Sequence, residues 1–253
     1  MTKKSQSIKS KLYPAIFLLS LIILWQLLSK IVPSYMLPSP YQVALALSND
    51  FPVLLSHSVT TLTEALVGLA LSVVIGVVSA SIMDRFEFLY LAAYPIIVLT
   101  QTIPAIAIAP LLVLWLGFGM APKVVLIFIT CFFPITISTL SGLRSVDPDI
   151  TDLMRSMGAS PRKILINVKL KASLDPFFAG LKLAGAYSII GAVIAEWLGG
   201  SAGLGVYMTR VRKAYAFDKM FAVIILISLI SLLLMGFIEI VHKKSMPWKG
   251  IKE

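Results

Sequence analysis

Long apolar segments alternate with short polar ones along most of the 253 residues. Six apolar segments are long enough to cross a bilayer, which takes about 20 residues in a helix. They cover residues 12–32, about 59–83, 88–118, 122–140, about 177–197 and about 219–241. The pattern predicts an all-α, polytopic membrane protein with about six transmembrane helices, built as a single domain over residues 1–253. The first segment is longer than a signal-peptide core and ends in Pro-Ser-Tyr, so we expect an uncleaved span.

Prolines interrupt the third segment at Pro95, Pro104 and Pro110. If the polar stretch after residue 142 is cytoplasmic, an even number of crossings must separate it from the short turn at 84–87. Residues 88–118 therefore form one crossing with a kinked or partly in-plane start, and 122–140 form the crossing back. Residues 33–57 hold four prolines and few charges, which predicts a loop with one short interfacial helix.

Composition supports membrane insertion and argues against a soluble domain or a nucleic-acid-binding protein. The chain is 58% hydrophobic and 13% charged, with a mean hydropathy of +0.92, far too apolar for a soluble domain. A net charge of +10 could suggest nucleic acid, but the topology above places sixteen of the 22 Lys and Arg residues inside and six outside. That bias is the positive-inside pattern, and it predicts cytoplasmic termini. The single cysteine, Cys131, lies in an apolar run, so no internal disulfide can form.

The longest polar stretch, residues 147–171, predicts two short helices joined by a sharp turn. Asp147-Pro148 and Ser160-Pro161 each supply an N-cap followed by a first-turn proline. Gly158 lies between them, where a helix end favours a residue that tolerates positive φ.

The first of these helices carries an apolar face. It consists of Ile150, Leu153, Met154 and Met157, spaced at i, i+3, i+4 and i+7. Such a face needs a partner. From the residues alone, that partner could be another protein, the bilayer or the chain's own helix bundle.

Small residues recur every four positions in two spans. The residues are Gly68, Ser72, Gly76 and Ala80 in the second span, and Gly180, Ala184, Ser188 and Ala192 in the fifth. Small residues at this spacing let helix backbones approach closely, so we interpret both sets as packing seams.

Few polar groups lie at membrane depth. Gln101 and Thr102 precede a proline, Tyr187 lies within the fifth span, and Glu196 lies at its end. A broken helix is tolerated in a bilayer only where protein or a water-filled cavity satisfies the freed backbone groups. These four residues are candidate translocation-pathway residues, with helix packing, or for Glu196 an interfacial position, as the alternative.

Motifs for catalysis are missing from the sequence. It contains no Gly-x-x-x-x-Gly-Lys-Ser/Thr phosphate loop. His57 and His242 are predicted near opposite membrane faces, so their spacing predicts neither a metal site nor a catalytic triad. We therefore expect no catalytic residues, cofactor or metal.

The polar stretch resembles the cytoplasmic coupling loop, or EAA loop, of inner-membrane permeases of ABC importers. That family has Glu-Ala-Ala, three residues, Gly, nine residues, Ile, one residue and Leu-Pro. The matching positions here are Asp152, Leu153, Met154, Gly158, Val168 and Leu170, with Lys171 in place of the proline. Blocks at 101–119 and 180–205 also resemble the family, and the likeness covers about residues 55–241. The permeases of the nitrate, sulfonate and taurine group are most similar, and the run at 207–222 resembles permeases for thiamine-precursor pyrimidines.

The resemblance implies an importer permease of the cell membrane that works as a homodimer, with lipid around its spans and no nucleic-acid partner. It also implies an ATPase on a separate cytoplasmic chain and an extracytoplasmic substrate-binding protein. The residues that it assigns to ATPase coupling are Asp152, Leu153, Met154, Met157, Gly158, Ala159, Val168 and Leu170. A thiamine-precursor pyrimidine is the favoured solute, with sulfonate, taurine or nitrate as the alternative. A secondary transporter and a structural membrane protein are the rivals from other classes.

Overall fold

The computed structural model describes residues 3–247, with side chains from Leu12 onward, and this part of the chain contains helices and no strand. Two compact units are present. Among the described residues, one comprises 3–56 with Tyr207–Leu226, and the other comprises His57–Val206 with 227–247. The helices are α1 (Lys3–Ile31), α2 (Pro40–Asn49), α3 (Phe51–Arg85), α4 (Glu87–Thr100), α5 (Ala105–Leu116), α6 (Met120–Arg144), α7 (Pro148–Ser156), α8 (Pro161–Ile164), the π-helix η1 (Leu165–Lys169), α9 (Leu170–Gly199), α10 (Leu204–Lys213) and α11 (Phe217–Ser245).

The prediction of about six spans is confirmed within residues 3–247. Five helices are long and apolar enough to cross a membrane, and the bent pair α4 and α5 supplies the sixth candidate. The bend between α4 and α5 is 99° and falls at residues 101–104, at the predicted proline break. Pro104 initiates α5, since its backbone is extended and the helix starts at the next residue.

In the first unit, α2 is the predicted short helix of the 33–57 loop. Its N-cap Ser39 accepts a hydrogen bond from the Gln42 N–H, and the Gln42 side chain accepts one from the Ser39 N–H, which completes a capping box. Trp25 stacks on Phe221 with ring centroids 6.0 Å apart. Sequence analysis did not anticipate α10, whose ten residues end in a basic turn.

A polar tie in the first unit predicts an acid-sensitive contribution to stability. The Asp50 carboxylate forms an ion pair with Lys219 at 2.7 Å and accepts a hydrogen bond from the Tyr207 hydroxyl. The Lys219 hydrogen bond, then the Tyr207 one, lowers the pKa of Asp50. Because the folded pKa lies below the unfolded value of about 3.9, this contribution is present above about pH 4 and is lost as pH falls through the folded pKa. The unfolding temperature of Asp50→Asn should therefore be lower than that of the wild type at pH 7, and the two temperatures should converge below about pH 4. A difference in unfolding temperature that stays constant with pH would contradict this prediction.

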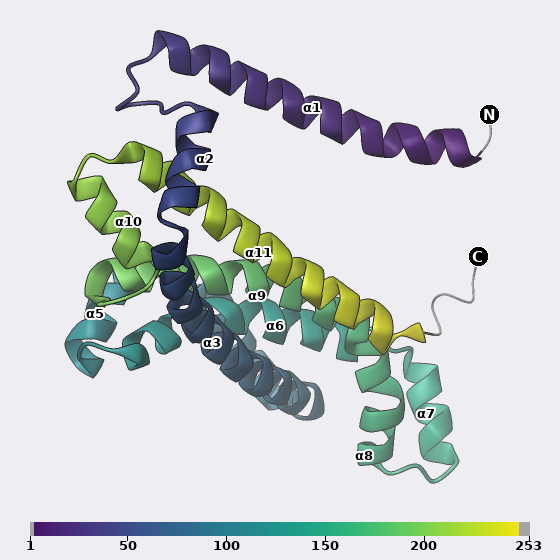
Figure 1. The fold of residues 1–253 in the computed structure, drawn as a ribbon. Coiled ribbons are helices and arrows are strands. Elements are labelled where there is room, and N and C mark those ends of the chain that lie inside the picture. The colour runs from purple at the N-terminus through teal and green to yellow at the C-terminus, as the bar shows by residue number, and fades with distance from the viewer. Residues whose placement is uncertain (1–2, 248–253) are drawn as a thin grey trace. The chain divides into compact units, whose positions relative to one another are not determined.

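Helix α6 lies at the centre of the second unit, between the two seams of small residues. A Cβ at Gly68 of α3 would lie 2.5 Å from Ile127 Cγ2, and a Cβ at Gly180 of α9 would overlap the Pro134 carbonyl. Ser72 and Ser188 are fully buried. The interpretation as packing seams is confirmed, because both sets allow a neighbouring backbone to reach α6. Figure 1 shows α6 and α9 side by side, with α7 and α8 as a pair at one end of this unit.

The second short helix of the polar stretch is present as α8, but it continues without a stop into the fifth span. From Pro161 the chain stays helical to Gly199, through α8, η1 and α9, over 39 residues. No glycine or proline occurs between Pro161 and Pro176, so nothing in that interval ends the helix. The π-turn at 165–169 keeps the chain helical between α8 and α9.

Candidate functional site

The polar helix pair, α7 with α8, has the caps that the sequence predicts. The Asp147 carboxylate accepts the Asp149 N–H at 2.9 Å, and the Ser160 hydroxyl accepts the Lys163 N–H at 3.4 Å. Gly158 has φ +81°, and its N–H donates to Arg155 O at 2.9 Å. The Ala159 N–H donates to Met154 O at 2.9 Å, so α7 ends in a Schellman motif. Gly158 and Ala159 therefore form the turn between the two helices.

The apolar face of α7 is uncovered in the single chain. The exposed fractions are 48% for Ile150, 62% for Leu153 and 78% for Met157, while Met154 is half-buried. Asp152 lies elsewhere on the helix, in an exposed ion pair with Arg155 at 2.8 Å. Three large exposed apolar side chains on a nine-residue helix and its C-cap are typical of a surface that a partner covers.

Val168 and Leu170 are separated from that face. Both are half-buried in the continuous helix that leads into α9. Leu170 packs against the buried cluster formed by Ala80, Met83, Leu140 and Leu143. Leu170 therefore anchors the base of the helix pair to the bundle, and the exposed α7 face is left to Leu153, Met157 and their neighbours.

A second feature is a cavity of about 260 Å³ at the α4–α5 break, hereafter the central cavity. It brings together Gln101 and Tyr187, which are 86 positions apart in the sequence. The other lining residues are Thr100, Ile103, Pro104, Ala105, Ile108, Ile129, Thr130, Ile190, Gly191 and Ile194. Five of the twelve lining residues are isoleucine, and the polar side chains are one amide, one phenol and two threonines. Such a mixture suits a small, largely apolar ligand with a few hydrogen-bonding groups.

The other two pathway candidates do not line the central cavity. Thr102 is exposed beside it, with its hydroxyl donating to Leu99 O at 2.8 Å. Glu196 is buried, with 1% exposure, near the C-terminal end of α9. Thr100 and Thr130 were missed by sequence reasoning, although a threonine next to Gln101 and another inside a span were available as signals.

Glu196 holds the turn between α9 and α10 through a buried network. Its Oε1 accepts the Thr61 hydroxyl at 2.7 Å, and its Oε2 accepts the Gly205 N–H at 2.6 Å. The Leu204 N–H donates to Thr61 Oγ1 at 2.9 Å. A Cβ at Gly203, which has φ +120°, would overlap the Glu196 carboxylate. Residues 203–205 are thus held by side chains of α3 and α9.

A buried ion pair lies in the same unit. Lys123 Nζ of α6 and Glu64 Oε1 of α3 are 2.5 Å apart, and both side chains are about 93% buried. A charge in an apolar surrounding is tolerated when an opposite charge is in contact with it. Sequence analysis did not single out this pair, although an acid near the start of one span and a lysine near the start of another were available as signals.

Removing the Glu196 carboxylate should destabilise the folded chain. Glu196→Leu leaves the Gly205 N–H without its acceptor, which costs about 1–3 kcal/mol, and leaves the Thr61 hydroxyl only its longer bond to His57 O at 3.2 Å. We expect a clearly lower unfolding temperature for the purified variant in detergent. Glu87→Leu is the matched control, because Glu87 is two-thirds exposed and its ion pair with Arg144 is solvated. Equal unfolding temperatures for the two variants would contradict a structural role for Glu196.

Comparisons with known proteins agree with these features. Residues 72–246 match the family described as the binding-protein-dependent transport system inner membrane component. The formylaminopyrimidine transport permease protein ThiX of Halalkalibacterium halodurans is 34% identical over 240 residues, which cover 94% of this chain and 96% of the relative. The putative aliphatic sulfonates transport permease protein SsuC of Bacillus subtilis is 30% identical over 256 residues, with 97% and 89% covered.

The fold is also similar to that of solved transporters. An inward-facing structure of the MetNI methionine ABC transporter matches with a TM-score of 0.69 and 18% identity, covering 77% of this chain and 96% of that chain. An amino acid ABC transporter structure matches with a TM-score of 0.66 and 15% identity. The match over most of the chain, together with the six candidate spans, shows that the chain belongs to the binding-protein-dependent transport system inner membrane components, the permease subunits of ABC importers.

Proposed function

We propose that this permease imports a small, uncharged nitrogen heterocycle of the thiamine-precursor pyrimidine class through the central cavity. The observation that carries the proposal is the cavity itself, where Gln101 and Tyr187 meet at the helix break. A carboxamide offers a donor and an acceptor side by side, which complements a ring nitrogen with an adjacent amino group. The isoleucines and the tyrosine ring suit the faces of a flat ring.

The charge of the cavity separates this solute from the alternatives. None of the twelve residues that line the central cavity is charged. Nitrate, taurine and alkyl sulfonates carry an anionic group, and an anion without a positive partner is costly to desolvate. The permease relatives include one named for formylaminopyrimidine and others named for sulfonates, nitrate and taurine. The uncharged lining of the central cavity favours a solute of the formylaminopyrimidine kind over the anions.

The working assembly that we propose is a homodimer with two copies of a separate ATPase chain and an external binding protein. Residues 1–253 act as one permease domain with both termini in the cytoplasm. The exposed α7 residues Leu153 and Met157 enter a cleft of the ATPase, and the Gly158 turn sets the angle between the two arms. ATP-driven closure of the ATPases then tilts the spans between inward and outward access.

A pull-down tests the assembly. The tagged full chain, solubilised in detergent, should retain an ATPase subunit that mass spectrometry identifies. Gly158→Asp should lose this subunit, because a non-glycine residue at φ +81° is strained by about 1–2 kcal/mol and shifts the turn. No atom lies within 4 Å of a Cβ at this position, so the variant should still fold. Recovery of a folded chain without any ATPase would favour the secondary-transporter alternative.

Uptake into proteoliposomes tests the solute. The importer reconstituted with its binding protein should accumulate labelled formylaminopyrimidine and should not accumulate taurine or nitrate. Accumulation of taurine or nitrate in place of the pyrimidine would overturn the assignment of a neutral heterocycle.

A further inference from the structure

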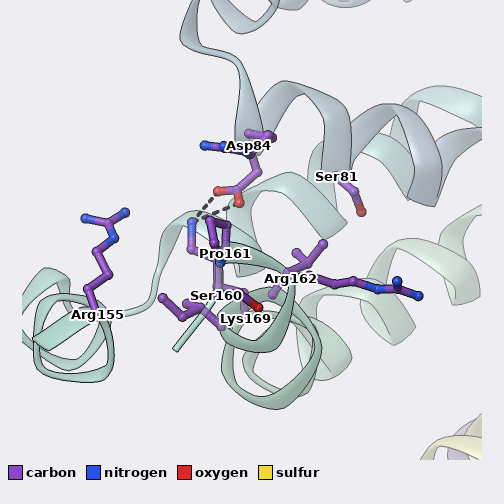
Figure 2. Close-up of a pocket in the computed structure, with 10 residues that line it drawn as sticks. Ser81, Asp84, Arg155, Ser160, Pro161, Arg162 and Lys169 are labelled. Carbon is purple, nitrogen blue, oxygen red and sulfur yellow. Dashed lines mark hydrogen bonds and ion pairs between the residues drawn. The ribbon is translucent and has the colours of Figure 1, made fainter. Parts of the chain in front are cut away.

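A pocket of about 540 Å³ lies where α3 ends and the helix pair begins, in the second unit. Figure 2 shows it, and we call it the basic pocket. Its lining residues are Ser81, Asp84, Arg85, Arg155, Ser160, Pro161, Arg162, Ile164, Leu165 and Lys169. Neither the translocation path nor the exposed α7 face includes this pocket, so the function proposed above leaves it without a role.

The pocket carries an excess of positive charge. Asp84 is the one acid among its lining residues, and Lys169 neutralises it with Nζ 2.8 Å from each carboxylate oxygen. Asp84 is 92% buried, so this pair is a fixed part of the pocket wall. Figure 2 shows the pair at the centre, with the Arg155 and Arg162 side chains extending to either side.

Three arginines remain for a ligand. Arg155 has only a solvent-exposed ion pair, with Asp152. Arg85 and Arg162 have no carboxylate partner within the part of the chain that the structure describes. Arg85 belongs to α3 and Arg162 to α8, so an anion held by both would tie the bundle to the helix pair.

The position of the pocket selects the kind of anion. Ser81 and Arg85 form the last turn of α3, and the helix that starts at Pro161 leads into the α9 span. Asp84 and Arg85 directly follow the second predicted span, at about 59–83, and Lys169 contacts Asp84. The pocket therefore lies beside the end of that span, near the depth of lipid headgroups. Val74 and Val78 lie on the same face of α3 as Ser81 and Arg85, and their exposed fractions are 63% and 52%. Exposed apolar side chains of α3 therefore lead along the helix to the basic pocket.

We propose that the basic pocket binds the phosphate headgroup of an anionic phospholipid, whose acyl chains lie along Val74 and Val78 of α3. Arg85 and Arg162 contact the phosphate, since guanidinium groups bind phosphate oxygens in pairs. The Ser160 hydroxyl, which already accepts the Lys163 N–H, keeps its own hydrogen for the ligand. The lipid bridges the transport bundle and the helix pair from the membrane side.

Native mass spectrometry of the purified full chain tests this proposal. The chain is released from nanodiscs of phosphatidylglycerol mixed with phosphatidylcholine, and retained lipid is counted. We expect one retained phosphatidylglycerol per chain. Arg85→Gln and Arg162→Gln should each weaken retention about fivefold, because a basic residue near the membrane surface is worth about 1 kcal/mol to an anionic lipid. Lys244→Gln is the matched control, since Lys244 is an exposed cation that does not line the pocket.

Three results would overturn the proposal. Equal retention of phosphatidylcholine would show that no anion site exists, and equal losses in Arg162→Gln and Lys244→Gln would show a diffuse charge effect. In a second arm, inorganic phosphate is added at rising concentration. Displacement of phosphatidylglycerol by inorganic phosphate from the wild type and from Lys244→Gln alike would identify a soluble anion as the ligand.

The complete importer provides a further arm. With the ATPase bound, phosphatidylglycerol should still be retained and lost in Arg162→Gln. Loss of the lipid whenever the ATPase is bound would mean that acidic residues of the ATPase occupy the pocket, and would overturn the lipid assignment. None of these readouts depends on the transported solute.

Discussion

Met157→Asp is expected to abolish both co-purification of the ATPase and ATP-driven uptake, while the amount of permease in the membrane stays the same. Met157 is 78% exposed and makes no internal packing that folding would miss. In the assembly, the new carboxylate would have to enter an apolar contact without a partner, which costs several kcal/mol. Truncation of a central interface residue typically costs 2 kcal/mol or more, so binding should weaken by at least about 30-fold.

The neighbouring variant Ser156→Asp is the matched control for this experiment. Both residues are exposed at the C-terminal end of α7, so a negative charge disturbs the helix dipole to a similar degree in each. Ser156 does not belong to the apolar face formed by Ile150, Leu153, Met154 and Met157. Retention of the ATPase by Ser156→Asp and its loss from Met157→Asp would locate the contact on that face. Equal loss from both would assign the effect to the helix end instead.

Gln101→Leu should lower the efficiency of pyrimidine uptake by about 10- to 100-fold. The substitution removes the only carboxamide among the residues that line the central cavity and keeps a similar side-chain volume. A solute group that loses its hydrogen-bond partner in an apolar cavity costs about 1–3 kcal/mol. Concentration-dependent uptake in proteoliposomes measures the effect, and binding of the ATPase should be unchanged.

Thr102→Val is the control for the cavity. Thr102 is adjacent to Gln101 at the same helix break, but it does not line the cavity, and its hydroxyl is engaged with Leu99 O. A loss in Thr102→Val equal to that in Gln101→Leu would mean that the break matters as a fold element and that the amide does not contact solute. Unchanged uptake in Gln101→Leu would favour the structural interpretation of this residue.

Local patterns in the sequence were sufficient for the turn of the helix pair. Asp147, Ser160 and Gly158 were assigned to caps and to a positive-φ turn from residue type and spacing, and each is found in that role. Capping depends on groups within three or four residues, so local sequence contains the whole interaction. The prediction that the second helix is short was wrong, because local sequence can show only a local stop signal. Nothing local stops the helix after Pro161, and a π-turn in the connection has no sequence signature.

The candidate sites needed information that no local pattern carries. Gln101 and Tyr187 were singled out separately as polar residues at membrane depth, but their meeting in one cavity depends on the 99° bend between α4 and α5. Glu196 was expected near a membrane boundary and is instead buried against Thr61, 135 positions earlier in the chain. The basic pocket brings Arg85 and Arg162 together. In the sequence analysis, these arginines entered only the count of Lys and Arg residues that predicts the membrane orientation.

The sequence by itself determined the membrane class, the number of spans, the seams of small residues and the apolar face of α7. Each of these follows from hydrophobicity and helical periodicity, which act over one or two turns or over the thickness of a bilayer. Only the tertiary structure decided that α6 receives both seams, that the broken helix lines a cavity and that buried acids find partners. Those outcomes depend on how helices far apart in sequence pack together, and packing depends on shape complementarity between surfaces that a linear pattern does not specify.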